Sequence, residues 1–376
     1  MKIVVSIDSF KGSLSSLQAG NAVKDAILRL DKDCDVLVKP LADGGEGTVD
    51  ALAEGCDSEI VELTVSGPLL NPVTAKYCIL KESNTAVIEM ASAAGITLIS
   101  AEERNPLETT TYGVGELIAD AIKRGCRRFL IGIGGSATND GGAGMLTALG
   151  YELSDKEGKP IALGAKGLED LHRINSENAV TQLKECTFHI ACDVTNPLCG
   201  DNGCSAVYGP QKGATPAMIK DMDRWLENYS EIAQRVSSNA DKDMPGAGAA
   251  GGLGFAFLAF TNATLKSGID IVLEETNMEA AIQDADIVVT GEGRLDSQTV
   301  MGKAPIGVAK LAKKHGKKVI AFSGCVTDDA DICNENGIDA FFPILRGVTT
   351  LEEALDVDQA YKNLTATAYQ VFRLLI

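Results

Sequence analysis

A glycine-rich stretch directly after an apolar segment constrains the fold of this chain more than any other feature. Residues 127–144 read RRFLIGIGGSATNDGGAG. Phe129–Ile133 is apolar and short enough for a buried strand, and a helical pattern covers Met145–Leu149. The order of strand, glycine-rich turn and helix directs backbone N–H groups and a helix N-terminus at one place, which suits an anion.

The residues of this turn have the chemistry of a phosphate site. Gly134 and Gly135 let the backbone approach a phosphate closely, and Ser136 and Asn139 add side-chain donors. Asp140 could hold a metal ion that the phosphate also binds. An ordinary strand-to-helix connection is the alternative, but the density of glycine and hydroxyl residues favours the phosphate site.

The size and composition of the chain fit globular domains. The 376 residues, of which 45% are hydrophobic and 23% charged, suggest about two domains with large cores. No apolar run is long enough to cross a bilayer, and Met1–Ile7 leads into a strand pattern without the features of a signal peptide. We therefore predict no membrane partner.

Charge and cysteine content limit the partners and the location. The net charge of −18 argues against a nucleic-acid partner, so local cations and backbone donors must hold any anionic substrate. Ten cysteines at irregular spacing, without a CxxC pair, fit reduced thiols and a cytoplasmic location. The oligomeric state stays open, with a homodimer as one option.

Strands and helices alternate at both ends of the chain but not in its middle. Ile3–Ile7, a helix after Ser15 and Asp35–Lys39 read as a βαβ unit, and residues 285–374 alternate in the same way. Residues 60–90 hold three strand candidates in a row, which indicates a different domain with some antiparallel sheet.

We therefore predict an α/β fold with two domains. A discontinuous Rossmann-like parallel-sheet domain takes residues 1–65 and 285–376 from both chain ends, and an inserted mixed α/β domain takes residues 66–284. We expect the active site in the cleft between the two domains.

Two early loops follow predicted strands and carry polar residues. Lys11 and Ser13 are candidate anion contacts, with a solvated surface lysine as the alternative for Lys11. Asp43 and Glu46 are candidates to bind magnesium or to orient a substrate hydroxyl. Their alternative role is to complement the dipole of the helix that follows.

Later strands also end in charged residues. Asp193 directly follows the predicted strand Thr187–Cys192, a position suited to chemistry. Glu292, Arg294 and Asp296 follow the predicted strand of residues 285–290, and the Arg294 guanidinium is suited to a carboxylate or a phosphate. Residues 199–216 have little periodicity and are predicted to form a long loop.

These loops together have the parts that phosphoryl transfer needs: backbone cradles, cations, ligands for a divalent metal and a carboxylate to accept a proton. A P-loop is absent, because Gly302-Lys303 is followed by Ala304 rather than by serine or threonine. The constellation predicts a kinase without a Walker motif.

The sequence resembles the type I glycerate kinase family of bacteria. The resemblance lies in six blocks that follow one another in family order along nearly the whole chain. They are DSFKGS at 8–13, PLADGGEGT at 40–48, GGSATNDGG at 134–142, CDVTNPL at 192–198, GAGAAGG at 246–252 and TGEGRLD at 290–296. The resemblance implies phosphorylation of D-glycerate by ATP with Mg²⁺, giving 2-phosphoglycerate in the breakdown of glycolate, glyoxylate or sugar acids.

The hypothetical roles divide the candidate residues into four groups. For catalysis we expect Asp193 as the base, with Asp296 as second choice, and Lys11 and Arg294 on the glycerate carboxylate or the transferred phosphoryl group. For ATP phosphates we expect Gly134, Gly135, Ser136 and Asn139; for the substrate Ser13, Asp43 and Glu46; and for Mg²⁺ Glu292 and Asp140.

Other activities remain alternatives at this stage. The 3-hydroxyl of glycerate or a related small hydroxy acid is the closest, because the choice of the 2-hydroxyl rests on the resemblance alone. A dehydrogenase would use the match Gly132-x-Gly134-x-x-Ala137 after a strand. A non-enzymatic sugar-acid sensor is the third, although the chain has no DNA-binding motif.

Overall fold

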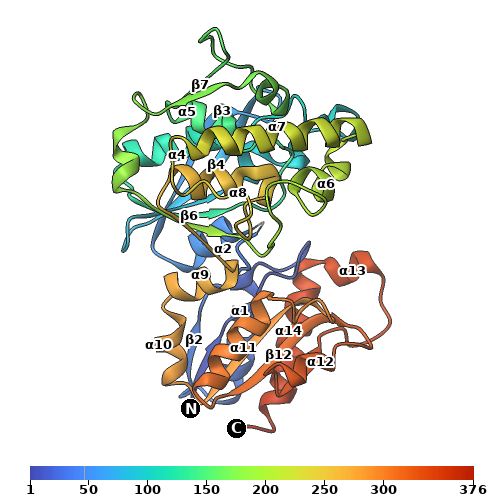
Figure 1. Cartoon of the computed structure of the whole chain (residues 1–376). Helices are drawn as coiled ribbons and strands as arrows, with labels where there is room; N and C mark the ends of the chain where they lie inside the picture. Colours follow the sequence, from blue (N-terminus) through green and yellow to red (C-terminus); the bar gives the residue numbers. More distant parts are fainter. Residues whose placement is uncertain (46) are drawn as a thin grey trace. The chain divides into compact units, whose positions relative to one another are not determined.

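The computed structural model describes residues 1–45 and 47–376, and the chain divides into two compact units (Figure 1). The first unit comprises residues 1–43, 50–57 and 267–376, and the second comprises residues 44–49 and 58–266. Glu46 lies outside the described residues. The division agrees with an α/β domain made from both chain ends and a second domain from the middle of the chain.

The first unit contains a five-stranded sheet in the order β13-β12-β11-β1-β2, and all neighbouring strands are parallel. Its strands are β1 (Lys2–Val5), β2 (Asp35–Val38), β11 (Ile287–Leu295), β12 (Lys318–Val326) and β13 (Ala340–Pro343). The chain passes from β1 to one side of the sheet and from β11 to the other. The order in which strands are added to the sheet thus reverses between β1 and β11. Open parallel sheets bind ligands at such a point, at the carboxyl ends of the strands.

The alternation of apolar residues along β1 explains why helices cover both faces of this sheet. Ile3 and Val5 share a core with Val289, whereas Val4 shares a second core with Val288. Neighbouring residues of a strand point to opposite faces, so each face needs its own helical layer.

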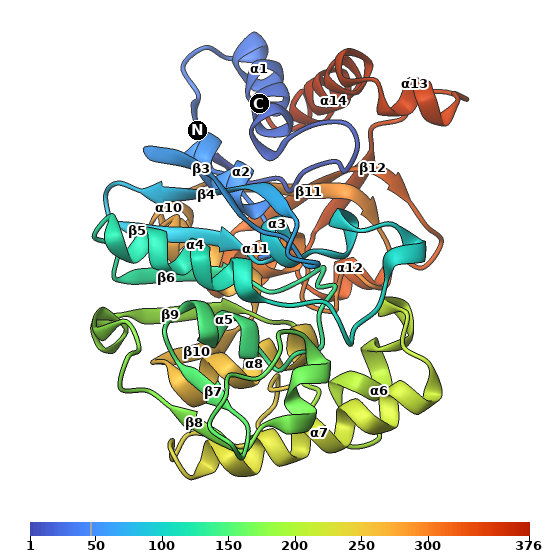
Figure 2. The ribbon, with the colours of Figure 1, turned by 90° about the horizontal axis from the view of Figure 1, so that it is seen from above.

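Helices from the two ends of the chain make these layers. One face carries α1 (Ser16–Leu30) and α14 (Val357–Phe372), which lie side by side (Figure 2). The other face carries α9 (Gly268–Glu275), α10 (Met278–Gln283), α11 (Ala304–Lys314) and α12 (Ile332–Glu335). The short helix α13 (Leu351–Leu355) precedes α14, and α2 (Thr48–Gly55) is divided between the two units.

The second unit contains a six-stranded mixed sheet in the order β10-β9-β6-β5-β4-β3. Its strands are β3 (Ser58–Ser66), β4 (Pro72–Leu80), β5 (Thr85–Glu89), β6 (Arg128–Gly132), β9 (Thr187–Ala191) and β10 (Ala263–Lys266). The neighbouring strands β10, β9, β6 and β5 are parallel to one another. The pairs β5–β4 and β4–β3 are antiparallel. The loops after β6 and β9 therefore leave the sheet at the same edge, on neighbouring strands.

Helices of this unit share one large core with the sheet. They are α3 (Ala91–Ala94), α4 (Tyr112–Lys123), α5 (Ala143–Ala148), α6 (Cys204–Tyr208), α7 (Pro216–Gln234) and α8 (Ala249–Phe260), and β7 (Glu152–Ser154) with β8 (Arg173–Asn175) forms a small antiparallel pair. The rings of Tyr229 in α7 and Phe255 in α8 pack edge to face at 5.3 Å. Among the described residues, no helix combines the length and the apolar character that a bilayer span requires.

The structure differs from the sequence prediction in three places. The strand of residues 58–66 pairs with β4 in the second unit, and residues 267–284 belong to the first, so the boundaries are not at 65 and 285. Residues 199–216 are not one long loop, because α6 and a 3₁₀ helix at Pro210–Lys212 lie within them. β11 continues to Leu295, because the sheet pairing with β12 extends through the glycines at 291 and 293.

The glycines at 246–252 serve close packing rather than dinucleotide binding. A Cβ on Gly251 would stand 2.0 Å from the Thr138 carbonyl oxygen, and one on Gly248 would stand 2.2 Å from that of Pro197. Gly141 N–H donates to the Gly251 carbonyl at 2.9 Å, and Gly248 N–H donates to that of Asn196 at the same distance. The segment thus connects the glycine-rich loop after β6 with the loop that carries Asp193.

Candidate active site

The loop after β1 meets the last residues of β11 at the carboxyl edge of the first unit's sheet. Asp8 N–H donates to the Gly291 carbonyl at 2.9 Å. A Cβ on Gly293 would lie 3.4 Å from both Phe10 Cα and Lys11 N, so the loop after β1 packs against β11 at this glycine. Lys11 is exposed, and Ser13 is half-buried.

Three carboxylates influence one another at this edge. Burial raises the pKa of Asp8 to about 7, and the negative charges of Asp43 and Glu292 act in the same direction. The Ser9 N–H and the Lys11 ammonium partly oppose them. Asp8 belongs to the DSFKGS block, but no role was predicted for it; its place directly after the first strand of a parallel sheet is the signal that could have found it.

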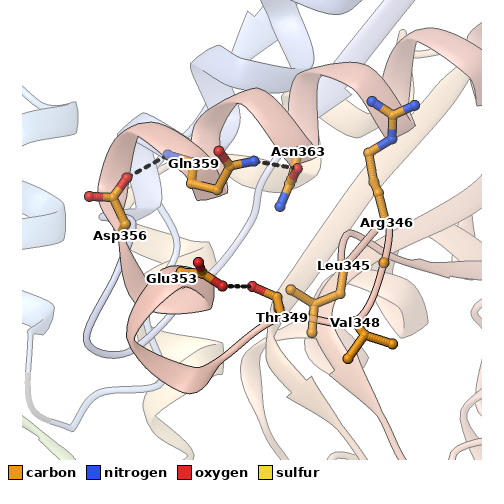
Figure 3. A pocket seen from close by; sticks show the side chains of 9 residues that line it. Leu345, Arg346, Val348, Thr349, Glu353, Asp356, Gln359 and Asn363 are labelled. Carbon is orange, nitrogen blue, oxygen red and sulfur yellow. Dashed lines mark hydrogen bonds between the residues drawn. The ribbon is translucent and has the colours of Figure 1, made fainter.

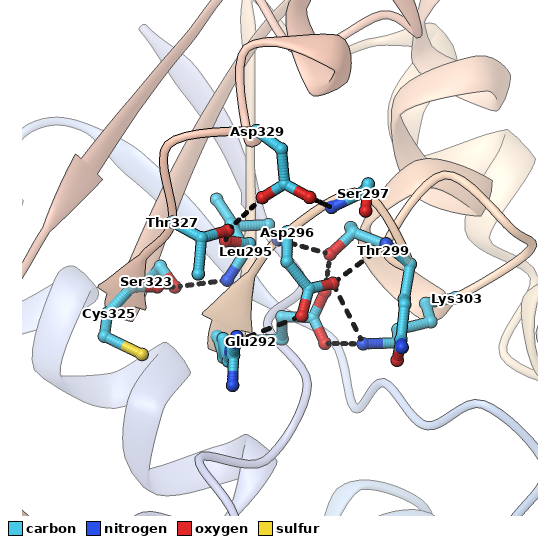
Figure 4. A network of polar contacts seen from close by, with 12 residues as sticks. Glu292, Leu295, Asp296, Ser297, Thr299, Lys303, Ser323, Cys325, Thr327 and Asp329 are labelled. Carbon is cyan, nitrogen blue, oxygen red and sulfur yellow. Dashed lines mark hydrogen bonds and ion pairs between the residues drawn. The ribbon is translucent and has the colours of Figure 1, made fainter.

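A polar network holds the end of β11 (Figure 4). Glu292 accepts a hydrogen bond from the Thr299 hydroxyl at 2.7 Å, and Lys303 Nζ lies 3.6 Å from Glu292 Oε2 and 3.8 Å from Asp296 Oδ1. Arg294 Nε lies 3.3 Å from Asp296 Oδ2. Glu292, Arg294 and Asp296 thus belong to one network at the end of β11, together with Thr299 and Lys303, which the sequence analysis missed.

The pKa of Glu292 is raised, chiefly by burial, although the Thr299 hydroxyl and the Lys303 ammonium oppose this. Burial is the largest cause of the raised pKa of both Asp8 and Glu292, and nearby carboxylates add to it. Within residues 1–45 and 47–376, no three side chains of His, Cys, Asp or Glu are close enough to form a complete metal site.

In the second unit, the glycine-rich loop has an unengaged backbone segment. The Gly135 carbonyl accepts from Ile96 N–H at 2.8 Å, and Ala137 N–H donates to the Ala94 carbonyl at 2.9 Å. In the described part of the chain, the backbone N–H groups of Gly134, Gly135 and Ser136 donate to no protein acceptor. A Cβ on Gly134 would meet nothing within 4 Å, so this side of the loop is open to a ligand.

The Ser136 hydroxyl accepts a hydrogen bond from a buried lysine that the sequence analysis missed. Lys212 is only 2% exposed, and its Nζ donates to Ser136 Oγ at 2.7 Å and to the Thr138 carbonyl at 2.6 Å. No sequence signal pointed to Lys212, because residues 199–216 lack periodicity and the lysine is 76 residues from Ser136.

The surroundings of Asp140 contradict its predicted role as a metal ligand. Its buried carboxylate accepts hydrogen bonds from the Thr111 N–H and hydroxyl, each at 2.9 Å, and from the N–H groups of Gly142 and Gly144 at 3.1 and 3.2 Å. These donors turn their positive ends toward both oxygens, where a cation would have to bind. Asp140 is therefore a structural carboxylate that fixes the start of α5.

The Asn139 side chain points into the unit. It is completely buried, and its Nδ2 donates to Ser205 Oγ at 2.8 Å. This burial argues against the predicted contact with a phosphate. Asp193 is exposed, two residues after the end of β9 and at the same sheet edge as the glycine-rich loop.

A hollow of about 450 Å³ lies after β13 and was not predicted (Figure 3). Its polar side chains bond to one another: Thr349 Oγ1 donates to Glu353 at 2.8 Å, and Gln359 Nε2 donates to Asn363 Oδ1 at 3.0 Å. Thr350 and Asp356 cap the helices α13 and α14 at its rim. These contacts account for the hollow as a consequence of helix capping.

Comparison with known proteins identifies the family. A sequence model described as the glycerate kinase family matches residues 3–376. The chain belongs to the glycerate kinase family. It is 46% identical over 372 residues to the glycerate 2-kinase of Escherichia coli K12, covering 98% of each chain, and 45% identical over 375 residues to the glycerate kinase of Haemophilus influenzae, covering 100% of this chain and 99% of the relative.

A solved structure extends the comparison to the fold. The crystal structure of a Salmonella typhimurium LT2 protein, described as a candidate glycerate kinase 2, matches with a TM-score of 0.93 at 46% identity over 100% of this chain and 98% of that chain. Membership of the glycerate kinase family makes the protein a phosphotransferase. The dehydrogenase and sensor alternatives are therefore not supported.

The charge of Asp8 should make the stability of this family member depend on pH. In the native protein the pKa of this carboxyl is about 7, against the usual aspartate pKa of 3.8. Its ionisation therefore costs stability increasingly between about pH 4 and pH 7, and fully above pH 7. We expect Asp8→Asn to raise the free energy of unfolding at pH 8 by on the order of 1–4 kcal/mol and to have little effect near pH 4. Urea denaturation without metal or nucleotide measures this.

The exposed Asp33→Asn is the matched control and should show no such gain. Equal stability changes for Asp8→Asn at pH 4 and pH 8 would contradict the raised pKa of the buried Asp8 carboxyl.

The two roles of Asp140 make opposite predictions for the metal-free protein. As a structural carboxylate, its replacement in Asp140→Asn removes a buried acceptor and should lower the free energy of unfolding by about 3 kcal/mol or more. Asp155→Asn, which removes an acceptor of two backbone N–H groups in a surface turn, should cost much less. Unchanged or increased stability of Asp140→Asn in EDTA would restore the metal-ligand role.

Proposed function

We propose that the protein transfers the γ-phosphoryl group of ATP to the 2-hydroxyl of D-glycerate, with Mg²⁺ as cofactor. The observation that carries this proposal is the open glycine-rich loop, in which three consecutive N–H groups and the Ser136 hydroxyl are available to an anion. The name of the E. coli relative, glycerate 2-kinase, supports the position of transfer. A cytoplasmic location stays a prediction.

In this proposal, Gly134, Gly135 and Ser136 bind phosphate oxygens of ATP through N–H groups that need no rearrangement. Mg²⁺ would neutralise charge on the phosphates when bound, and Glu292 with the neighbouring Asp43 would hold it. Asp43 and Ser13 remain candidates for the substrate hydroxyls. The predicted role of Glu46 lies outside the described residues and stays a prediction.

Lys11 and Arg294 are proposed to bind the glycerate carboxylate or the transferred phosphoryl group. Both side chains are exposed. Lys11 follows β1 and Arg294 lies in β11, the two adjacent strands between which the strand order reverses. Because Arg294 Nε lies near Asp296, its guanidinium is held in place while its other donors stay available. The position of the active site between the two domains stays a prediction.

Asp193 is proposed as the base that accepts the proton of the attacking hydroxyl. Its exposure lets a substrate reach the carboxylate. Asp296 is the second choice, although its contacts with Arg294, Lys303 and Gln298 N–H favour an anchoring role.

The activity itself can be tested by ADP release from the purified protein with MgATP and D-glycerate. We expect the product to react with enolase without added phosphoglycerate mutase, because enolase accepts the 2-phosphate. A product that needs the mutase would mean transfer to the 3-hydroxyl. Absence of ADP release, in folded protein that binds ATP, would direct the search to other small hydroxy acids.

The role of Asp193 can be tested by Asp193→Asn, which keeps the shape of the side chain and removes its basicity. We expect kcat to fall by about 10²- to 10⁴-fold with D-glycerate affinity retained. Asp201→Asn, on the exposed segment that follows, is the matched control and should be near normal. Near-normal turnover by Asp193→Asn would remove Asp193 from this role and make Asp296→Asn and Asp8→Asn the next variants.

A further inference from the structure

Lys212 is a buried cation that contacts no carboxylate among the described residues. Its Nζ is held between Ser136 Oγ and the Thr138 carbonyl, and the side chain is 2% exposed. Transfer of an ammonium group out of water is unfavourable unless hydrogen bonds or opposite charges compensate. An apolar side chain would fill the same space without this cost, so the charge itself needs an explanation.

The hydrogen bonds of Lys212 determine what the Ser136 hydroxyl can do. An ammonium group donates only, so Ser136 Oγ must act as acceptor in this contact. The Ser136 proton then remains as a donor, and within residues 1–45 and 47–376 it has no acceptor. A hydroxyl that accepts from a cation is also a stronger donor.

Unpartnered buried groups beside this contact point to a ligand. Thr138 is completely buried, and its Oγ1 has no hydrogen-bond partner among the described residues. The N–H groups of Gly134, Gly135 and Ser136 are likewise unengaged. Backbone and side-chain donors next to a buried cation are the features of a site for a polyphosphate.

We propose that Lys212 is a positioning residue of the phosphate site: it fixes the Ser136–Thr138 segment, directs the Ser136 hydroxyl proton outward and supplies positive charge beneath the loop to the phosphates of a nucleotide. This inference rests on the proposed function for the identity of the loop as the nucleotide-phosphate site. It gives the phosphate site a lysine, which this chain does not supply through a Walker motif.

The charge state of Lys212 depends on few groups. Burial lowers the pKa of Lys212 to about 8, and Cys204 of α6 and Asp140 of the glycine-rich loop oppose this. Bound phosphates would raise the pKa of the ammonium again. A Lys212 that is partly deprotonated at pH 8.5 should therefore take up a proton when a polyphosphate binds.

The first test measures affinities of the full chain for ATP and for inorganic tripolyphosphate by calorimetry at pH 7.5. Lys212→Met, which removes the charge and keeps most of the volume, should weaken both by about 10- to 100-fold. Lys212→Arg should restore part of the affinity. Lys220→Met on the exposed face of α7 is the control and should bind as the unaltered protein does.

Unchanged tripolyphosphate affinity of folded Lys212→Met would overturn the inference, and a lower melting temperature alone would mark Lys212 as merely structural. If Lys212→Met does not fold, proton uptake on tripolyphosphate binding at pH 8.5, measured in buffers of different ionisation enthalpy, decides instead. We expect uptake by the unaltered protein and less by Lys212→Arg; equal uptake, or none, would overturn the inference.

Failure of the proposed function is distinguishable from failure of this inference. A protein that binds tripolyphosphate through Lys212 but does not phosphorylate D-glycerate would contradict the function alone. A protein that phosphorylates D-glycerate while Lys212→Met keeps full affinity for ATP would contradict the inference alone.

Discussion

Two buried charges hold the glycine-rich loop from opposite ends. Lys212 donates hydrogen bonds to the Ser136 hydroxyl and the Thr138 carbonyl, and Asp140 accepts hydrogen bonds from the N–H groups of Thr111, Gly142 and Gly144. Each charge is costly to bury, so the loop must keep the geometry in which the hydrogen bonds of both are satisfied. Such a loop can present unengaged N–H groups without collapsing onto them, which is the preorganisation that anion binding requires.

The parallel sheets supply the second constraint, because they bring distant parts of the sequence to one edge. In the first unit, Asp8 and Glu292 are 284 residues apart in sequence, but Asp8 follows β1 and Glu292 lies near the end of the adjacent strand β11. In the second unit, the loops with Ser136 and Asp193 leave the neighbouring strands β6 and β9. The proposed roles of these residues follow from strand order rather than from proximity along the chain.

Strong local patterns allowed much of this to be predicted. The apolar run Phe129–Ile133, its glycine turn and the helix predicted after Ser15 correspond to β6, the loop and α1. The α/β fold with a domain from both chain ends was predicted as well. The domain boundaries were not, because Ser58–Ser66 pairs across a hairpin with β4, and sheet membership depends on which strand pairs with which.

The sequence by itself determined the family, the strand–glycine–helix order and the chemical types of the candidate residues, since these depend on local composition and spacing. Only the tertiary structure decided which carboxylate is buried and which is exposed. Asp140 and Asp193 both follow strands, but one is completely buried among donors and the other is exposed. Lys212 likewise became visible only in the folded chain, because burial and hydrogen bonding over 76 residues leave no periodic signal in the sequence.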